Sequence, residues 1–132
     1  KDMIMSAMNA VSGTNIKIFG VTALTSLSDS DSHNIYQRTC YEQVSAMLDI
    51  AEASDIDGVV CSPHELKLVN KRKSLLSITP GIRINDSLDD QKRIMTPKEA
   101  IGLGADYIVI GRPITSSINI KESLNKIYES IQ

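Results

Sequence analysis

The stretch DQKRIMTPKEAIGLGADYIVIGRPIT, residues 90–115, decides how this chain folds. Thr96 followed by Pro97 is typical of a helix N-cap and a first helical position, and Gly104 indicates where that helix ends. Residues 107–110 form a continuous apolar run, which predicts a strand buried on both faces of a parallel sheet. Gly111 and Arg112 then follow the strand, where backbone N–H groups and a guanidinium suit an anion. Because α/β folds bind ligands beyond the carboxyl ends of their strands, this stretch predicts a phosphate site.

The rest of the chain repeats the alternation of strand and helix. Ser62 and Glu65 have the spacing of a capping box, and residues 24–34 and 80–94 are polar and predict loops. Met3, Met5, Met8 and Met47 stand at helical positions and predict core packing rather than contact with a cofactor. The predicted strands are residues 16–22, 58–61, 75–79 and 107–110, and the predicted helices are residues 2–12, 35–53, 62–70, 98–103 and 120–131. This order predicts an α/β fold of four parallel β/α units in one domain, residues 1–132.

The length of the chain is about half of what a closed barrel requires. A (β/α)8 barrel needs about 250 residues, and this chain has 132. Four parallel strands alone leave two unpaired sheet edges. The sequence leaves three possibilities open: the other half lies outside this chain, two half-chains associate, or the sheet stays open.

Composition excludes several classes of partner. The formal net charge is −2 and no basic tract occurs, which argues against nucleic acid or an anionic membrane. No apolar run approaches the roughly 20 residues of a membrane-spanning helix. Cys40 and Cys61 lack C-x-x-C spacing, which favours reduced thiols in a cytoplasmic protein. His33 and His64 lack the spacing of metal ligands and are predicted to be surface residues, so no metal site is expected.

Four motifs together resemble one enzyme family. They are residues 21–26 (VTALTS), 57–62 (DGVVCS), 79–83 (TPGIR) and 90–115, and they are similar to the C-terminal half, strands five to eight, of orotidine 5′-phosphate decarboxylase. The resemblance covers essentially the whole chain. It implies a TIM (β/α)8 barrel that works as a homodimer. It also implies a lyase reaction of pyrimidine biosynthesis, in which orotidine 5′-phosphate loses CO2 to give uridine 5′-phosphate without a metal or an organic cofactor.

The chain departs from the family in one respect. The family's catalytic Asp-x-Lys-x-x-Asp motif lies on its third strand, and nothing here matches it. Asp90-Gln91-Lys92 has an aspartate two residues before a lysine, but it falls in the family's phosphate-loop segment. The resemblance therefore implies no catalytic residue in this chain, which alone is expected to be inactive and to need a companion N-terminal half. The alternative is a non-catalytic half-barrel that binds phosphate or self-associates. A third interpretation, another phosphate-binding barrel acting on ribulose or indole-glycerol phosphates, is disfavoured by the motif at residues 90–115.

The resemblance also implies a set of substrate-binding residues. Arg112 and Gly111 would hold the phosphate, Arg83 would lie near it, and Gln91 would close over the ligand from a lid loop. Thr25 would contact the pyrimidine or ribose, and Pro80 would shape the pocket near the base. The complete set is Thr25, Pro80, Arg83, Gln91, Gly111 and Arg112. For each residue the alternative is an ordinary turn, cap or solvated loop position.

Overall fold

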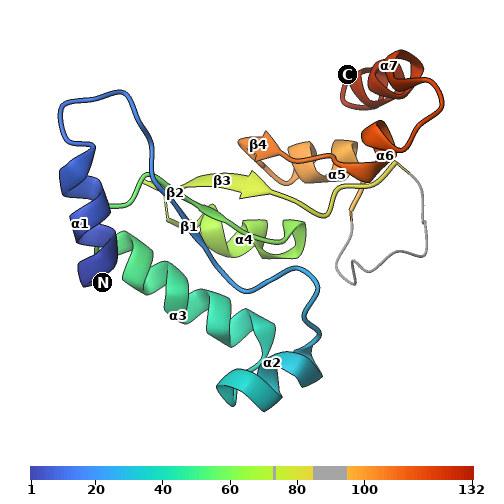
Figure 1. Ribbon diagram of the computed structural model, residues 1–132. Coiled ribbons are helices and arrows are strands. Elements are labelled where there is room, and N and C mark those ends of the chain that lie inside the picture. Colours follow the sequence, from blue (N-terminus) through green and yellow to red (C-terminus); the bar gives the residue numbers. More distant parts are fainter. Residues whose placement is uncertain (73, 85–94) are drawn as a thin grey trace.

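The computed structural model describes residues 1–72, 74–84 and 95–132, and these ranges contain a four-stranded parallel sheet. The strands follow the chain in the order β1-β2-β3-β4, as Figure 1 shows. Their bounds are β1 Phe19–Val21, β2 Gly58–Val60, β3 Leu76–Thr79 and β4 Tyr107–Ile108. Every neighbouring pair is parallel, which confirms the predicted succession of β/α units. Within the described ranges, β1 and β4 are therefore the two edge strands of the sheet.

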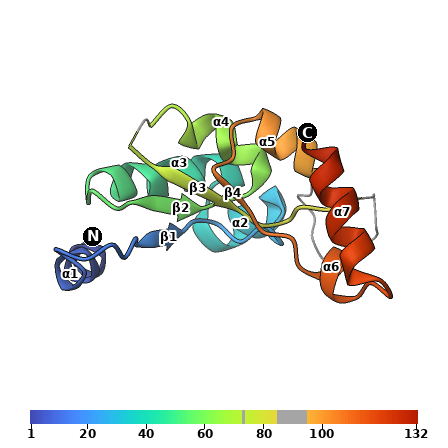
Figure 2. The same ribbon diagram turned by 90° about the horizontal axis from the view of Figure 1, so that it is seen from above.

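Helices cover one side of this sheet. Figure 2 shows α3, α4 and α5 in a row along one side of the strands, whereas α1 and α7 lie at opposite ends of the molecule in both views. The helices are α1 Asp2–Ala10, α2 Asp29–Tyr36, α3 Cys40–Glu52, the 3-10 turn η1 Pro63–Glu65, α4 Leu66–Val69, α5 Pro97–Gly102, α6 Arg112–Thr115 and α7 Ile120–Ser130. The buried core lies between the sheet and these helices, with Val44, Leu48, Val59, Leu66 and Val69 almost fully buried.

The other face of the sheet is apolar but partly open. Successive side chains of a strand alternate between faces, and the register aligns Val21, Val60, Ile78 and Tyr107 across the four strands. On the same face the rings of Phe19 and Tyr107 meet edge to face, with centroids 6.4 Å apart. Val21 is 60% exposed and Tyr107 is 52% exposed. The side chains of the two edge strands are therefore accessible on this face.

Two aspartates fix the amino ends of the strands. The Asp57 carboxylate accepts a hydrogen bond of 2.7 Å from the backbone N–H of Ile18, which joins the start of β2 to the approach to β1. The Asp106 carboxylate accepts from both the N–H and the hydroxyl of Ser77, at 2.8 and 2.9 Å, and the Asp106 N–H donates to the Ser77 hydroxyl at 3.0 Å. Ser77 is fully buried, so these bonds set the register of β3 and β4.

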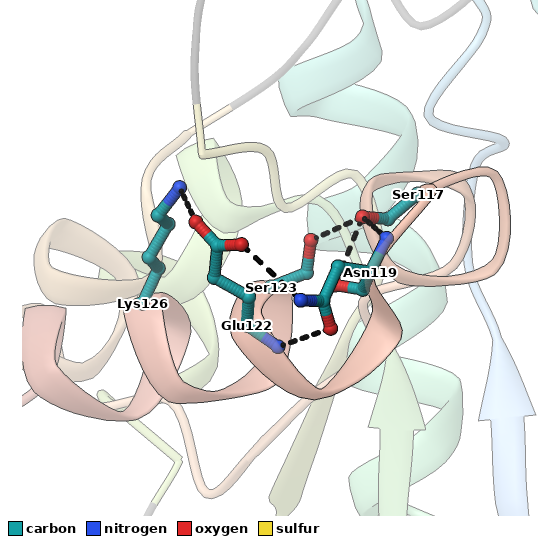
Figure 3. Close-up of polar contacts among 5 residues, drawn as sticks. All are labelled: Ser117, Asn119, Glu122, Ser123 and Lys126. Carbon is teal, nitrogen blue, oxygen red and sulfur yellow. Dashed lines mark hydrogen bonds and ion pairs between the residues drawn. The ribbon is translucent and has the colours of Figure 1, made fainter.

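Helices start where the predicted capping residues stand. The capping box of Ser62 and Glu65 forms, and Thr96 caps α5 with Pro97 in its first turn, as predicted. Gly104 has φ +86°, the left-handed conformation that ends a helix. At the C-terminus, Figure 3 shows that Asn119 caps α7 by accepting from the Glu122 N–H at 3.2 Å.

Polar contacts stiffen the first turns of α7. The Ser123 hydroxyl donates to the Ser117 hydroxyl at 2.8 Å, and Lys126 pairs with Glu122 at 2.7 Å one turn away (Figure 3). This ion pair lowers the pKa of Glu122 and raises the pKa of Lys126, through their hydrogen bond first and their mutual charge second. Side chains of α7 and of the residues just before it thus hold the start of the helix in place.

Two predicted elements were wrong. Residues 24–34 were predicted as loop, but α2 begins inside them, because Ser28 and Asp31 form a capping box. The predicted helix 35–53 is two helices, since Gln37 takes φ +57° and Thr39 starts α3 with another capping box. Regular strand pairing in the last strand covers only Tyr107–Ile108 of the predicted 107–110.

The predictions of burial failed at the two ends of the molecule. The last strand was expected to be buried on both faces, but Tyr107 and Val109 are about half exposed. Met3 and Met5 were expected to fill the core, but Met3 is 82% exposed and Met5 is also exposed, whereas Met8 packs against the core. These residues lie on the first helix and the last strand, beside which the described chain supplies no further β/α unit.

Candidate functional site

The predicted binding residues follow the carboxyl ends of the strands. Thr25 comes four residues after β1, Pro80 comes directly after β3, and Gly111 lies three residues after β4. Because all four strands are parallel, their carboxyl ends meet at one edge of the sheet. Arg83 and Arg112 therefore lie on segments that leave neighbouring strands at the same edge. Gln91 falls outside the described residues.

A small hollow opens at this edge, beside β1, β2 and β3. Its empty volume is about 290 Å³ and its lining is largely apolar. Thr25 and Pro80, which the sequence singles out, both contribute to it. The complete lining is Val21, Ala23, Leu24, Thr25, Val60, Cys61 and Pro80. Thr25 is nearly buried and is one of the residues that line this hollow.

A backbone hydrogen bond fixes the position of Arg83. Its N–H donates to the Met95 carbonyl at 3.0 Å, and the Met95 N–H donates to the Gly81 carbonyl at 3.3 Å. This bridge joins the two segments that flank residues 85–94. Arg83 is only 6% exposed, and one of its terminal nitrogens donates to the Ile82 carbonyl at 3.0 Å. A buried guanidinium at the carboxyl edge is a fixed positive charge, not a solvated loop cation.

Gly111 is the N-cap of a short helix, α6, and Arg112 is its first residue. The Gly111 carbonyl accepts from the N–H groups of Ile114 and Thr115 at 2.9 and 3.1 Å. Gly111 and Arg112 are both exposed, and Pro113 occupies the first turn. A methyl group added to Gly111 would meet no atom within 4 Å, so the surface above this residue is open.

In the described ranges 1–72, 74–84 and 95–132, no group of three His, Cys, Asp or Glu side chains is placed to hold a metal ion. His33 and His64 are exposed, as predicted. Cys40 and Cys61 are buried free thiols rather than a disulfide. Across the same residues, no helix combines the length and apolarity needed to span a bilayer.

Sequence reasoning missed most of the hollow's lining. Cys61 was expected to be a reduced thiol, and it is buried but also lines the hollow together with Thr25 and Pro80. Ala23 and Leu24 were not singled out, although they stand in the same motif as Thr25. The available signal was their position: each follows the end of a predicted parallel strand, and such residues meet at one edge.

Comparisons with known proteins agree with this geometry. The model of the family described as Orotidine 5′-phosphate decarboxylase / HUMPS matches residues 1–127. An orotidine 5′-phosphate decarboxylase from Ehrlichia canis is 41% identical over 134 residues, covering 99% of this chain and 59% of the relative. One from Wolbachia pipientis is 46% identical over 132 residues, covering 98% of this chain and 58% of the relative.

Solved structures give the same result. The crystal structure of orotidine 5′-phosphate decarboxylase from Lactobacillus acidophilus superposes with a TM-score of 0.76 at 32% identity, covering 98% of this chain and 58% of that chain. An orotidine 5′-monophosphate decarboxylase from Sulfolobus solfataricus, at 16% identity and a TM-score of 0.65, shares the fold. The chain thus spans about three-fifths of the length of the relatives it matches, namely their C-terminal part. This chain belongs to the orotidine 5′-phosphate decarboxylase family and has the fold of half its TIM barrel.

Proposed function

We propose that the chain is the phosphate-binding half of an orotidine 5′-phosphate decarboxylase, which converts orotidine 5′-phosphate to uridine 5′-phosphate and CO2. The observation that carries the proposal is the common edge of Arg83 and Arg112. They follow the neighbouring strands β3 and β4, which are parallel. Two guanidinium groups on adjacent segments at one edge match the charge of a phosphate monoester.

The phosphate would be held by Arg112, by the backbone N–H of Gly111, and by Arg83. The exposed Arg112 and Gly111 are open to a ligand, whereas the buried Arg83 supplies a preorganised charge. Gln91 would close over the ligand, in keeping with the family resemblance. Charged hydrogen bonds of this kind are each worth about 1.5–3 kcal/mol.

The pyrimidine would lie toward the apolar hollow. Thr25 would donate or accept a hydrogen bond to the base or ribose, and Pro80 would form the wall beside the ring. A largely apolar hollow with one buried hydroxyl suits a flat heterocycle, because its few polar groups fix orientation and the remainder excludes water.

The chemical step needs groups from outside this chain. Loss of CO2 leaves a carbanion at C6 of the pyrimidine, and a positioned lysine must stabilise this charge and deliver a proton. The Asp-x-Lys-x-x-Asp pattern that would supply it does not occur in the sequence. A companion N-terminal half would provide it, so we expect the chain alone to bind nucleotide without decarboxylating orotidine 5′-phosphate.

Calorimetry with uridine 5′-phosphate tests the phosphate site. Replacing Arg112 with alanine should weaken binding by about 1.5–3 kcal/mol, roughly 10- to 150-fold in Kd. Lys121→Ala is the matched control, since it removes one exposed positive charge from α7 and should leave Kd unchanged. Equal affinities for the wild type and Arg112→Ala would refute the assignment.

A second assay separates the two candidate functions. Decarboxylation should be absent for the chain alone and present when an N-terminal fragment carrying the family's missing β/α units is co-expressed. Nucleotide binding with no activity in either arm would instead favour a non-catalytic half-barrel.

A further inference from the structure

Gly81 adopts a backbone conformation that few other residues tolerate. It lies two residues after the end of β3 and has φ +86°, in the left-handed region. Glycine reaches this region freely because it has no Cβ. A residue with a side chain loses about 5- to 30-fold in the equilibrium population of this conformation. The position therefore requires glycine, and the question is what its conformation achieves.

The conformation of Gly81 closes a short backbone bridge. The Gly81 carbonyl accepts from the Met95 N–H at 3.3 Å, and the Met95 carbonyl accepts from the Arg83 N–H at 3.0 Å. Ile82 lies between these two bonds, opposite Met95 and parallel to it. Gly81, Ile82, Arg83 and Met95 are called the Gly81–Met95 bridge below. Rotation about φ of Gly81 moves the chain that follows, so a negative φ would carry the Gly81 carbonyl and the Arg83 N–H away from Met95.

Both sides of the Gly81–Met95 bridge are anchored in the core. On one side, Ile82 is fully buried and belongs to the hydrophobic core cluster. On the other side, Thr96 follows Met95 and caps α5 by accepting from the Glu99 N–H at 3.3 Å. Ala100 of α5 is also fully buried. The bridge thus joins the carboxyl end of β3 to the start of α5 through two packed elements.

The orientation of Arg83 depends on this bridge. Its N–H makes one of the two bridge bonds, and one of its terminal nitrogens donates to the Ile82 carbonyl at 3.0 Å. Arg83 is only 6% exposed, so its side chain has little freedom to compensate for a displaced backbone. Because the bidentate hydrogen bonds of a guanidinium depend on geometry, a shift of the backbone weakens its grip on an anion.

We propose that Gly81 is a positioning residue for the phosphate: its left-handed backbone closes the Gly81–Met95 bridge, and the bridge holds Arg83 in the orientation that binds the anion. This inference rests on the proposed function, in which Arg83 binds phosphate. Gly81 acts here through Arg83 and not by touching the ligand. If a substitution opens the bridge in a fraction of the molecules, the apparent Kd rises by the inverse of the fraction that stays closed.

Calorimetry with uridine 5′-phosphate tests this role. Gly81→Ala should raise Kd about fivefold or more, and Gly81→Asn should recover part of the loss, because asparagine tolerates the left-handed region better than alanine. Gly13→Ala is the matched control. Gly13 has φ +79° and an added methyl group there meets nothing within 4 Å, so the variant carries similar backbone strain far from Arg83 and should leave Kd unchanged. In an Arg83→Ala background, Gly81→Ala should have no further effect on Kd, because its partner is gone.

Hydrogen exchange gives a readout that needs no ligand. The Arg83 amide should exchange faster in Gly81→Ala than in the wild type, because its bond to Met95 opens more often, and should be unchanged in Gly13→Ala. Equal protection of this amide in Gly81→Ala and the wild type would overturn the inference. Binding that Arg112→Ala weakens and Gly81→Ala leaves unchanged would overturn the positioning role alone. A wild type that binds no uridine 5′-phosphate would overturn the proposed function and, with it, the role of Arg83.

Discussion

Replacing Gly58 with alanine is the sharpest test of how the sheet is packed. A methyl group at this position would lie 2.4 Å from the Leu76 carbonyl oxygen, which is backbone of the neighbouring strand. It would also lie 2.5 and 2.8 Å from two carbons of the Phe19 ring. The ring lies over Gly58 and meets the Tyr107 ring edge to face, so one obstacle is backbone of a paired strand and the other is a half-buried ring.

The cost follows from which atoms must move. Overpacking in a core typically costs 1–3 kcal/mol, and a clash with a strand carbonyl is relieved only by shifting the backbone. We therefore expect Gly58→Ala to lower the free energy of unfolding by about 2–3 kcal/mol. Gly102→Ala is the matched control: its methyl group meets nothing within 4 Å at the end of α5, and should stabilise by up to about 1 kcal/mol.

Urea denaturation followed by far-UV circular dichroism measures both values at one fixed protein concentration, since association shifts apparent stability. The chain has no tryptophan, so tryptophan fluorescence cannot serve. A Phe19→Ala background separates the two clashes, because it removes the ring and leaves the Leu76 oxygen. The added cost of Gly58→Ala should then fall by about 0.5–1.5 kcal/mol without vanishing.

The result that would refute this reasoning is a Gly58→Ala protein within 0.5 kcal/mol of the wild type. The Phe19 ring would then not cross β2 at this glycine, and the register of β1, β2 and β3 would be different. A loss that is unchanged by Phe19→Ala would assign the whole effect to the backbone oxygen.

Two further outcomes are expected. Asp106→Ala should lower the free energy of unfolding, measured by urea titration, by about 1–3 kcal/mol, because it leaves the buried Ser77 N–H without its acceptor. A change below about 0.5 kcal/mol would contradict the role of that carboxylate. The pKa of Glu42 is lowered mainly by the hydrogen bond from the Thr39 N–H and secondly by the bond from the Thr39 hydroxyl. The pKa of Glu99 is lowered mainly by the bond from the Thr96 hydroxyl and secondly by the bond from the Thr96 N–H. These carboxylates stabilise the fold fully above the ordinary glutamate pKa, and this contribution is lost as the pH falls through their lowered pKa values. Stability measured from pH 7 down to pH 3 should therefore fall less steeply in the Glu42→Gln, Glu99→Gln protein, and an unchanged slope would contradict the assignment.

The sequence alone determined the succession of elements and the half-barrel class. These depend on local chemistry: Ser62 and Thr96 cap helices through their own side chains, and Gly104 adopts a left-handed conformation open to few other residues. The positions of Thr25, Pro80 and Gly111 at one edge also followed from the sequence, because parallel strands place their carboxyl ends together. The capping box of Ser28 and Asp31 was not considered in the prediction, so the helix that it starts, α2, was missed.

Only the tertiary structure decided what is buried. Residues 107–110 are apolar enough to be buried on both faces, yet Tyr107 and Val109 remain half exposed because no further strand stands beside β4 in the described chain. Conversely, Arg83 is a charged loop residue by sequence, but it is almost fully buried. Burial depends on which distant segments of the structure pack against a residue. The residues next to it in the sequence do not say which segments those are, or whether another chain supplies them.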